Sequence, residues 1–157
     1  MKIEKQITIC KSDTKYILFP ESRNEIGLWI AHSPYFVISA NGIQYLNNSI
    51  KEALQYSNSG LLVEENAPQK VLKELHVKSW NALYKNYKIF SLSLTESSII
   101  ITPWKYSQKG MFPDTESKCV FDIHVIDTVG EKFAALINDG LSHNGEFIEL
   151  YPIVKED

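Results

Sequence analysis

Asp122 and His124 are the first residues in this chain whose types and spacing suggest chemistry. A carboxylate that orients a histidine, beside a serine or cysteine nucleophile, is the arrangement of hydrolytic triads. Residues two apart share a face of a β-strand, so this pair would lie on the polar face, opposite Cys119, Phe121 and Ile123. That position favours two solvated surface residues. No GxSxG motif supplies a serine nucleophile.

The other chemically versatile residues form no recognisable motif. Cys10 and Cys119 lie in apolar, strand-like segments without CxxC spacing, which favours buried, inert thiols over a disulfide or a metal site. The four histidines are far apart in the sequence: His32, His76, His124 and His143. No HExxH, P-loop or GxGxxG pattern occurs. We therefore expect no catalysis, no metal and no cofactor.

Hydrophobic periodicity predicts the elements that position these residues. Alternating or short continuous apolar runs predict strands over residues 3–9, 16–19, 28–30, 35–38, 88–95, 98–102, 119–125 and 147–154. Apolar residues at three- and four-residue spacing predict helices between Gly42 and Gly60, and over residues 68–75, 80–84 and 128–140. Pro20 and Pro103 are expected to end their strands. The polar residues 106–116 are expected to form a loop, and Thr128 with Glu131 fits a helix capping box.

The order of these elements predicts the fold class. Strands and helices do not alternate strictly, which favours an α+β fold with a central, mostly antiparallel sheet and helices packed on one face. The chain has 157 residues, 44% hydrophobic and 22% charged, which is typical of one globular domain that can bury a sizeable core. We therefore expect residues 1–157 to form a single domain.

Charge and hydropathy restrict the partners. The net charge is −3, and no basic stripe is present, so nucleic-acid binding is not expected. The N-terminus has no apolar segment of the kind found in signal peptides, and no run approaches the roughly 18 apolar residues of a membrane span. These features predict a cytoplasmic location without membrane contact.

One region resembles a known family. Residues 75–83 lead into the predicted strand that ends at Leu94, and the strand over 98–102 ends before Pro103. A further strand and the segment 127–136 follow. This order, over residues 75–141, resembles the immunity proteins of bacterial contact-dependent growth inhibition systems, in particular a family of this length once known only as a domain of unknown function. The N-terminal part matches in general layout.

The resemblance implies a protein that is not an enzyme and that blocks a toxin domain, often a nuclease, delivered by neighbouring cells. It also implies that the sheet edge can accept a toxin β-hairpin, which would satisfy unpaired backbone groups. Acidic and aromatic residues in polar segments after strands are the candidate toxin contacts: Glu21, Glu25, Trp104, Tyr106, Asp114 and Glu116. One alternative is a small hydrolase-like enzyme with a non-obvious site, in which His124, Asp122 or another histidine would meet a nucleophile. The other is an adaptor that dimerises through its sheet edge; a monomer is favoured.

Overall fold

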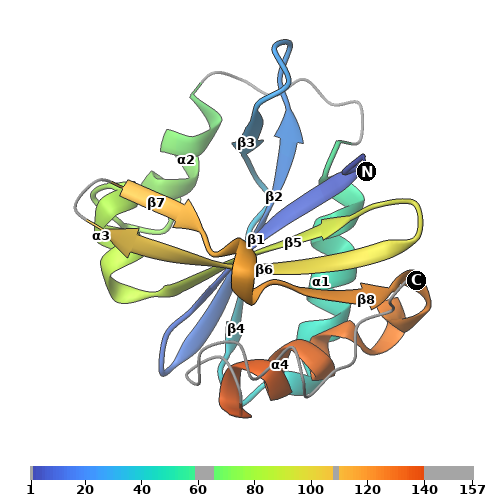
Figure 1. Cartoon of the computed structure of the whole chain (residues 1–157). Helices are drawn as coiled ribbons and strands as arrows, with labels where there is room; N and C mark the ends of the chain where they lie inside the picture. The colour runs from blue at the N-terminus through green and yellow to red at the C-terminus, as the bar shows by residue number, and fades with distance from the viewer. Residues whose placement is uncertain (1, 59–65, 108–109, 140–157) are drawn as a thin grey trace.

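The computed structural model describes residues 2–58, 66–107 and 110–139, which form one curled antiparallel sheet with helices on both sides (Figure 1). Four long strands form its centre, in the spatial order β2 (Lys15–Arg23), β1 (Lys5–Lys11), β5 (Lys88–Leu94) and β6 (Ser98–Ser107). Two short strands pair side by side along β2, and these are β3 (Trp29–Ala31) and β4 (Phe36–Ser39). Two more pair along β6, and these are β7 (Gly110–Pro113) and β8 (Cys119–Asp122). The predicted α+β class and antiparallel sheet are confirmed.

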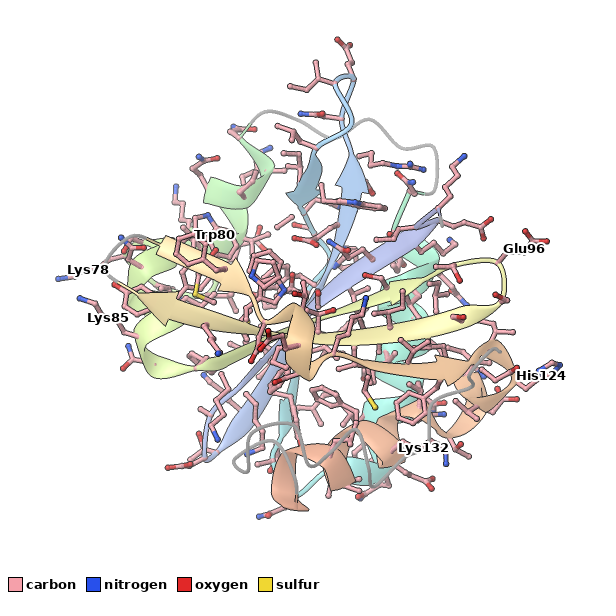
Figure 2. All side chains as sticks on the ribbon, viewed as in Figure 1. Lys78, Trp80, Lys85, Glu96, His124 and Lys132 are labelled. Atoms are coloured by element: carbon pink, nitrogen blue, oxygen red, sulfur yellow. The ribbon has the colours of Figure 1, made fainter. Side chains whose placement is uncertain are left out.

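In the described part of the chain, four helices cover the sheet in two layers. One layer consists of α1 (Ile43–Tyr56) and α4 (Val129–Asp139), which enclose the larger hydrophobic core. The other consists of α2 (Ala67–Glu74) and α3 (Trp80–Asn86), which enclose a smaller one. Figure 2 shows Trp80 of α3 and Lys132 of α4 at opposite sides of the molecule. The sheet is therefore the middle layer of the fold.

This second layer corrects the expectation that helices pack on one face only. The central strands bury residues on both faces: in β2, Tyr16 and Leu18 lie in the larger core, and Ile17 and Phe19 lie in the smaller one. An apolar patch on each face has to be covered, so each face recruits its own helices. The alternation in residues 88–95 suggested a single apolar face because small serines occupy part of the second one.

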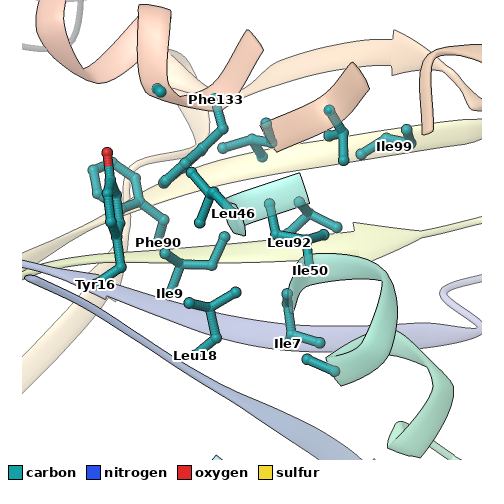
Figure 3. Packing of buried hydrophobic residues seen from close by; sticks show 14 of the residues in the cluster. Ile7, Ile9, Tyr16, Leu18, Leu46, Ile50, Phe90, Leu92, Ile99 and Phe133 are labelled. Carbon is teal, nitrogen blue, oxygen red and sulfur yellow. The ribbon is translucent and has the colours of Figure 1, made fainter. Parts of the chain in front are cut away.

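Aromatic packing fixes α4 on the sheet (Figure 3). The ring of Phe133 meets that of Phe90 edge to face, with centroids 5.0 Å apart, and lies 6.4 Å from that of Tyr16. All three residues are buried. Such ring pairs add to the free energy of plain area burial. In the larger core, α4 therefore packs directly against the central strands of the sheet.

Both prolines that were expected to end strands lie inside them. Pro20 continues β2, where its carbonyl accepts a hydrogen bond from the His32 N–H at 3.0 Å. The ring nitrogen of Pro20 points to the same side of β2 as its carbonyl. On this side, the pairing with β4 ends at Leu18 and the pairing with β3 starts at Glu21, so Pro20 lies in the gap between them. No ladder donor is needed there. Likewise, β6 continues through Pro103 to Ser107.

The N-terminus of α4 differs from the predicted capping box. The Gly130 N–H donates to Asn47 Oδ1 of α1 at 3.0 Å, whereas the Thr128 hydroxyl bonds the Val125 carbonyl. A Cβ on Gly130 would lie 2.5 Å from the Asn47 backbone nitrogen, so this glycine allows α1 and α4 to approach closely. The cap is therefore supplied by a neighbouring helix, which local sequence spacing does not reveal.

Two other segments depart from the expectations. The predicted strand over 119–125 ends at Asp122 and continues as the 3₁₀-helix η2 (Ile123–Thr128). The predicted loop over 106–116 holds the end of β6, strand β7 and the 3₁₀-helix η1 (Thr115–Ser117). The predicted strand over 147–154 lies outside the described residues. Within the described part of the chain, no helix is long and apolar enough to cross a membrane.

Candidate binding pocket

A pocket of about 480 Å³ opens on the sheet face that carries the smaller core. The two ends of the curled sheet meet here, because Trp29 on β3 and Met111 on β7 both line the pocket although these strands lie at opposite ends of the strand order. Trp80 and Tyr84 of α3 form a further wall. A volume of this size is in the range of sites that hold a side chain or a small ligand.

The floor of the pocket is polar, which is unusual for the inner face of a sheet. The register places Gln6 of β1 between Glu21 of β2 and Ser93 of β5. The Ser93 hydroxyl donates to Gln6 Oε1 at 2.7 Å, and Gln6 Nε2 donates to Glu21 Oε1 at 2.6 Å. Ser91 lies in the same floor and accepts the Trp104 indole N–H at 3.0 Å. These hydrogen bonds orient a carboxylate toward the pocket.

Glu21 is the charged group of the floor. The pocket leaves the residue half-buried, yet protein atoms surround its carboxylate, and this burial raises the pKa of Glu21. Hydrogen bonds from Gln6 and Thr8 oppose the rise in pKa without cancelling it. None of the described lysines or arginines forms an ion pair with Glu21. The pocket therefore contains an acid that its own surroundings do not neutralise.

Aromatic rings make the walls above this acid. The Trp80 ring lies 5.6 Å from that of Phe19 and stacks with Tyr84 at 6.1 Å and 29°. At the rim, the Arg23 guanidinium lies over the Trp29 ring, 5.2 Å from its centroid. Burial, followed by electrostatic interaction with Cys10 and Glu21, raises the pKa of Tyr84. Aromatic faces and one carboxylate together are suited to a cation.

Ser57, just after α1, links the two strands β1 and β2 beneath the pocket. Its fully buried hydroxyl accepts the Gln6 N–H at 2.8 Å and donates to the Glu21 carbonyl at 2.6 Å. The hydroxyl thus bridges backbone groups of β1 and β2 at the residues that carry the floor. Asn58 adds a second tie, because its N–H donates to the Ser22 hydroxyl at 2.7 Å.

Two of the six residues predicted as toxin contacts line the pocket. Glu21 and Trp104 both line the pocket, Glu21 from within β2 and not from a loop. The other four lie outside it: Glu25, Tyr106, Asp114 and Glu116. Asp114 forms an ion pair with Lys105 at 3.3 Å. Their role in binding stays a prediction. Sequence reasoning missed Gln6, Ser91 and Ser93, although polar residues at alternate positions of two apolar strands were a visible indication.

The side chains of Asp122 and His124 contact each other, as the sequence suggested, but they do so on the protein surface. The Asp122 carboxylate contacts His124 Nδ1 and also accepts the His124 backbone N–H at 2.8 Å. The backbone hydrogen bond, followed by the side-chain one, lowers the pKa of Asp122. The His124 side chain is 88% exposed and does not line the pocket. This contact starts η2 as an N-terminal cap, which is a structural role.

The described residues also include no group of three metal-ligating side chains suited to hold an ion.

A curled antiparallel sheet with this arrangement of helices occurs in other solved proteins. One is a protein of unknown function from Neisseria meningitidis, with a TM-score of 0.61 and 13% identity over 85% of this chain and 97% of that one. Another is a chain of a CdiA-CT/CdiI toxin and immunity complex from Yersinia pseudotuberculosis, with a TM-score of 0.55 and 12% identity over 83% of this chain and 94% of that one. No protein-family model and no curated protein matches the sequence. At such identities the likeness concerns the fold.

Proposed function

We propose that this protein is an immunity protein that binds and neutralises the toxin domain of a contact-dependent growth inhibition system, without catalysis of its own. The observation that carries the proposal is the similarity, along most of both chains, to a chain of a toxin and immunity complex. The resemblance of residues 75–141 to immunity proteins supports the same reading. The acidic net charge of −3 suits a basic partner such as a nuclease, because complementary charge speeds encounter.

The edge of β7 is the docking strand in this proposal. The Asp114 N–H donates to the Pro103 carbonyl, so the backbone groups of Asp114 and Phe112 point toward β6. The backbone groups of Met111 then point the opposite way, where β7 ends the strand order. A toxin strand that pairs there would satisfy these groups and would enter the pocket, which Met111 also lines.

The test of the function is co-expression. The probe is the C-terminal toxin domain of a large exoprotein encoded next to this chain, produced in a sensitive bacterial host with and without this protein. The expected result is restored growth and co-purification of the two proteins as one complex. Growth arrest that persists despite folded, co-expressed protein would remove the proposal. Size-exclusion chromatography with light scattering checks the free protein, because a stable homodimer through β7 would block this edge.

A pair of variants tests the edge itself. Met111→Pro removes the outward N–H of β7 and leaves the ladder to β6 intact, so we expect weaker complex formation and weaker protection. Met111→Leu keeps the N–H and a similar volume, so it is the matched control and is expected to protect fully. Full protection by a folded Met111→Pro variant would exclude docking at this edge, while leaving the neutralising function in place.

A further inference from the structure

The pocket floor presents a buried acid within aromatic walls, and no cation among the described residues pairs with it. We propose that this pocket binds the guanidinium group of an arginine side chain presented by a protein partner, with Glu21 as its counter-ion. The protein nature of the partner rests on the proposed function, whereas the chemistry of the pocket rests on the contacts described above. Charge complementarity is the main reason, because a buried carboxylate is stable only when a positive group or several hydrogen bonds compensate it.

Hydrogen-bond capacity leaves room for such a partner. An ionised carboxylate offers about four acceptor positions, and Gln6 and Thr8 occupy about two of them in Glu21. The unused positions are suited to the paired N–H donors of a guanidinium group, which bind a carboxylate in a fixed fork geometry. A lysine ammonium is compact and strongly hydrated, so its transfer into a pocket with aromatic walls costs more free energy.

The walls match the flat shape of the same group. Trp80 and Tyr84 stack nearly parallel beside the floor, and a planar guanidinium can lie against such rings. The protein already shows this contact at the rim, where Arg23 lies over Trp29. Arg23 shares its strand face with Glu21 but forms no ion pair with it, so it leaves the floor open.

The experiment titrates the wild-type protein with three amides of identical backbone: Nα-acetyl-arginine, Nα-acetyl-lysine and Nα-acetyl-citrulline N-methylamide. Citrulline has the shape of arginine without its charge. Indole N–H resonances of the pocket tryptophans report binding. We expect arginine to bind with a dissociation constant in the millimolar range, about tenfold more tightly than citrulline, and more tightly than lysine. Equal responses to arginine and citrulline, or no response to arginine, would overturn the proposal.

Two variants assign the effect to Glu21. Glu21→Gln keeps the acceptor for Gln6 and removes the charge, so arginine affinity should fall about tenfold. Glu74→Gln removes an exposed acid of α2 that does not line the pocket and should leave affinity unchanged. The free Glu21→Gln protein should be at least as stable as wild type, because an uncompensated buried charge is gone. Unchanged arginine affinity in folded Glu21→Gln contradicts the assignment. The wild-type comparison of probes stands even if this variant does not fold.

The outcomes separate this inference from the proposed function. Arginine-selective binding in a protein that fails to block the toxin would keep the pocket chemistry and remove the function. Protection without arginine selectivity would keep the function and remove the pocket chemistry.

Discussion

Ser57 offers a sharp test of how the pocket is held, because one hydroxyl serves two strands. Ser57→Ala removes the acceptor of the Gln6 N–H and the donor to the Glu21 carbonyl, which lie 2.8 and 2.6 Å from the hydroxyl oxygen. The site is fully buried, so water cannot replace the hydroxyl readily. Each unpaired group costs about 1–3 kcal/mol, and partial relaxation of the strand ends reduces the sum. We therefore expect a loss of about 2–4 kcal/mol of unfolding free energy.

The assay is urea denaturation followed by tryptophan fluorescence, with the free energy taken by linear extrapolation. Ser97→Ala is the matched control, because Ser97 is exposed and its hydroxyl meets only that of Ser98, at 3.4 Å. The control should change stability by less than about 0.5 kcal/mol. A loss below about 1 kcal/mol for Ser57→Ala, with an unchanged denaturant slope, would refute the bridge between β1 and β2.

Three further outcomes follow from the packing and the pKa shifts. Gly130→Ala should lower stability by about 1–3 kcal/mol, because its Cβ would meet Asn47 backbone atoms at 2.5 and 2.7 Å; an unchanged thermal midpoint contradicts this. Burial raises the pKa of Glu21 in the folded state above the ordinary 4.5, so wild-type stability should fall as pH rises through and beyond that value. Denaturation at several pH values should show this fall weakened in Glu21→Gln, and an unchanged profile contradicts it. Burial raises the pKa of Cys119 to about 11 and that of Cys10 further, so a thiol reagent at pH 8 should modify both only after denaturation. Rapid modification of the native protein would contradict this.

Local patterns were sufficient for most of the elements. The hairpin of β5 and β6 and the amphipathic helix α1 followed directly from alternate and helical spacing. The strand ends predicted at Pro20 and Pro103 were wrong, because a proline removes a ladder hydrogen bond only where its nitrogen faces an acceptor on a paired strand. That arrangement is set by pairing with distant strands, which a single sequence does not display.

The pocket was only partly accessible to sequence reasoning. Glu21 and Trp104 were singled out as loop residues, yet both line the pocket because the sheet curls and brings together β2 and β6, which lie three places apart in the strand order. Ser91 and Ser93 alternate with apolar residues in the sequence, yet both are more than nine-tenths buried. A polar side chain in a strand indicates either solvent or an enclosed polar floor. Only the tertiary arrangement of β1, β2 and β5 decides between them.

The strands of the sheet differ in how many hydrogen bonds hold them, because β2 and β6 each pair with two short strands on their outer side. On its other side, β2 pairs with the long strand β1, and β6 pairs with the long strand β5. Amide exchange should therefore be slowest in the middle ladder and fastest in the flanking strands, which have few bonds to break. A partner that displaces or extends a flanking strand would remodel one rim while the middle ladder keeps the molecule folded. If the proposed partner docks at this rim, recognition and retention of the scaffold depend on different strands.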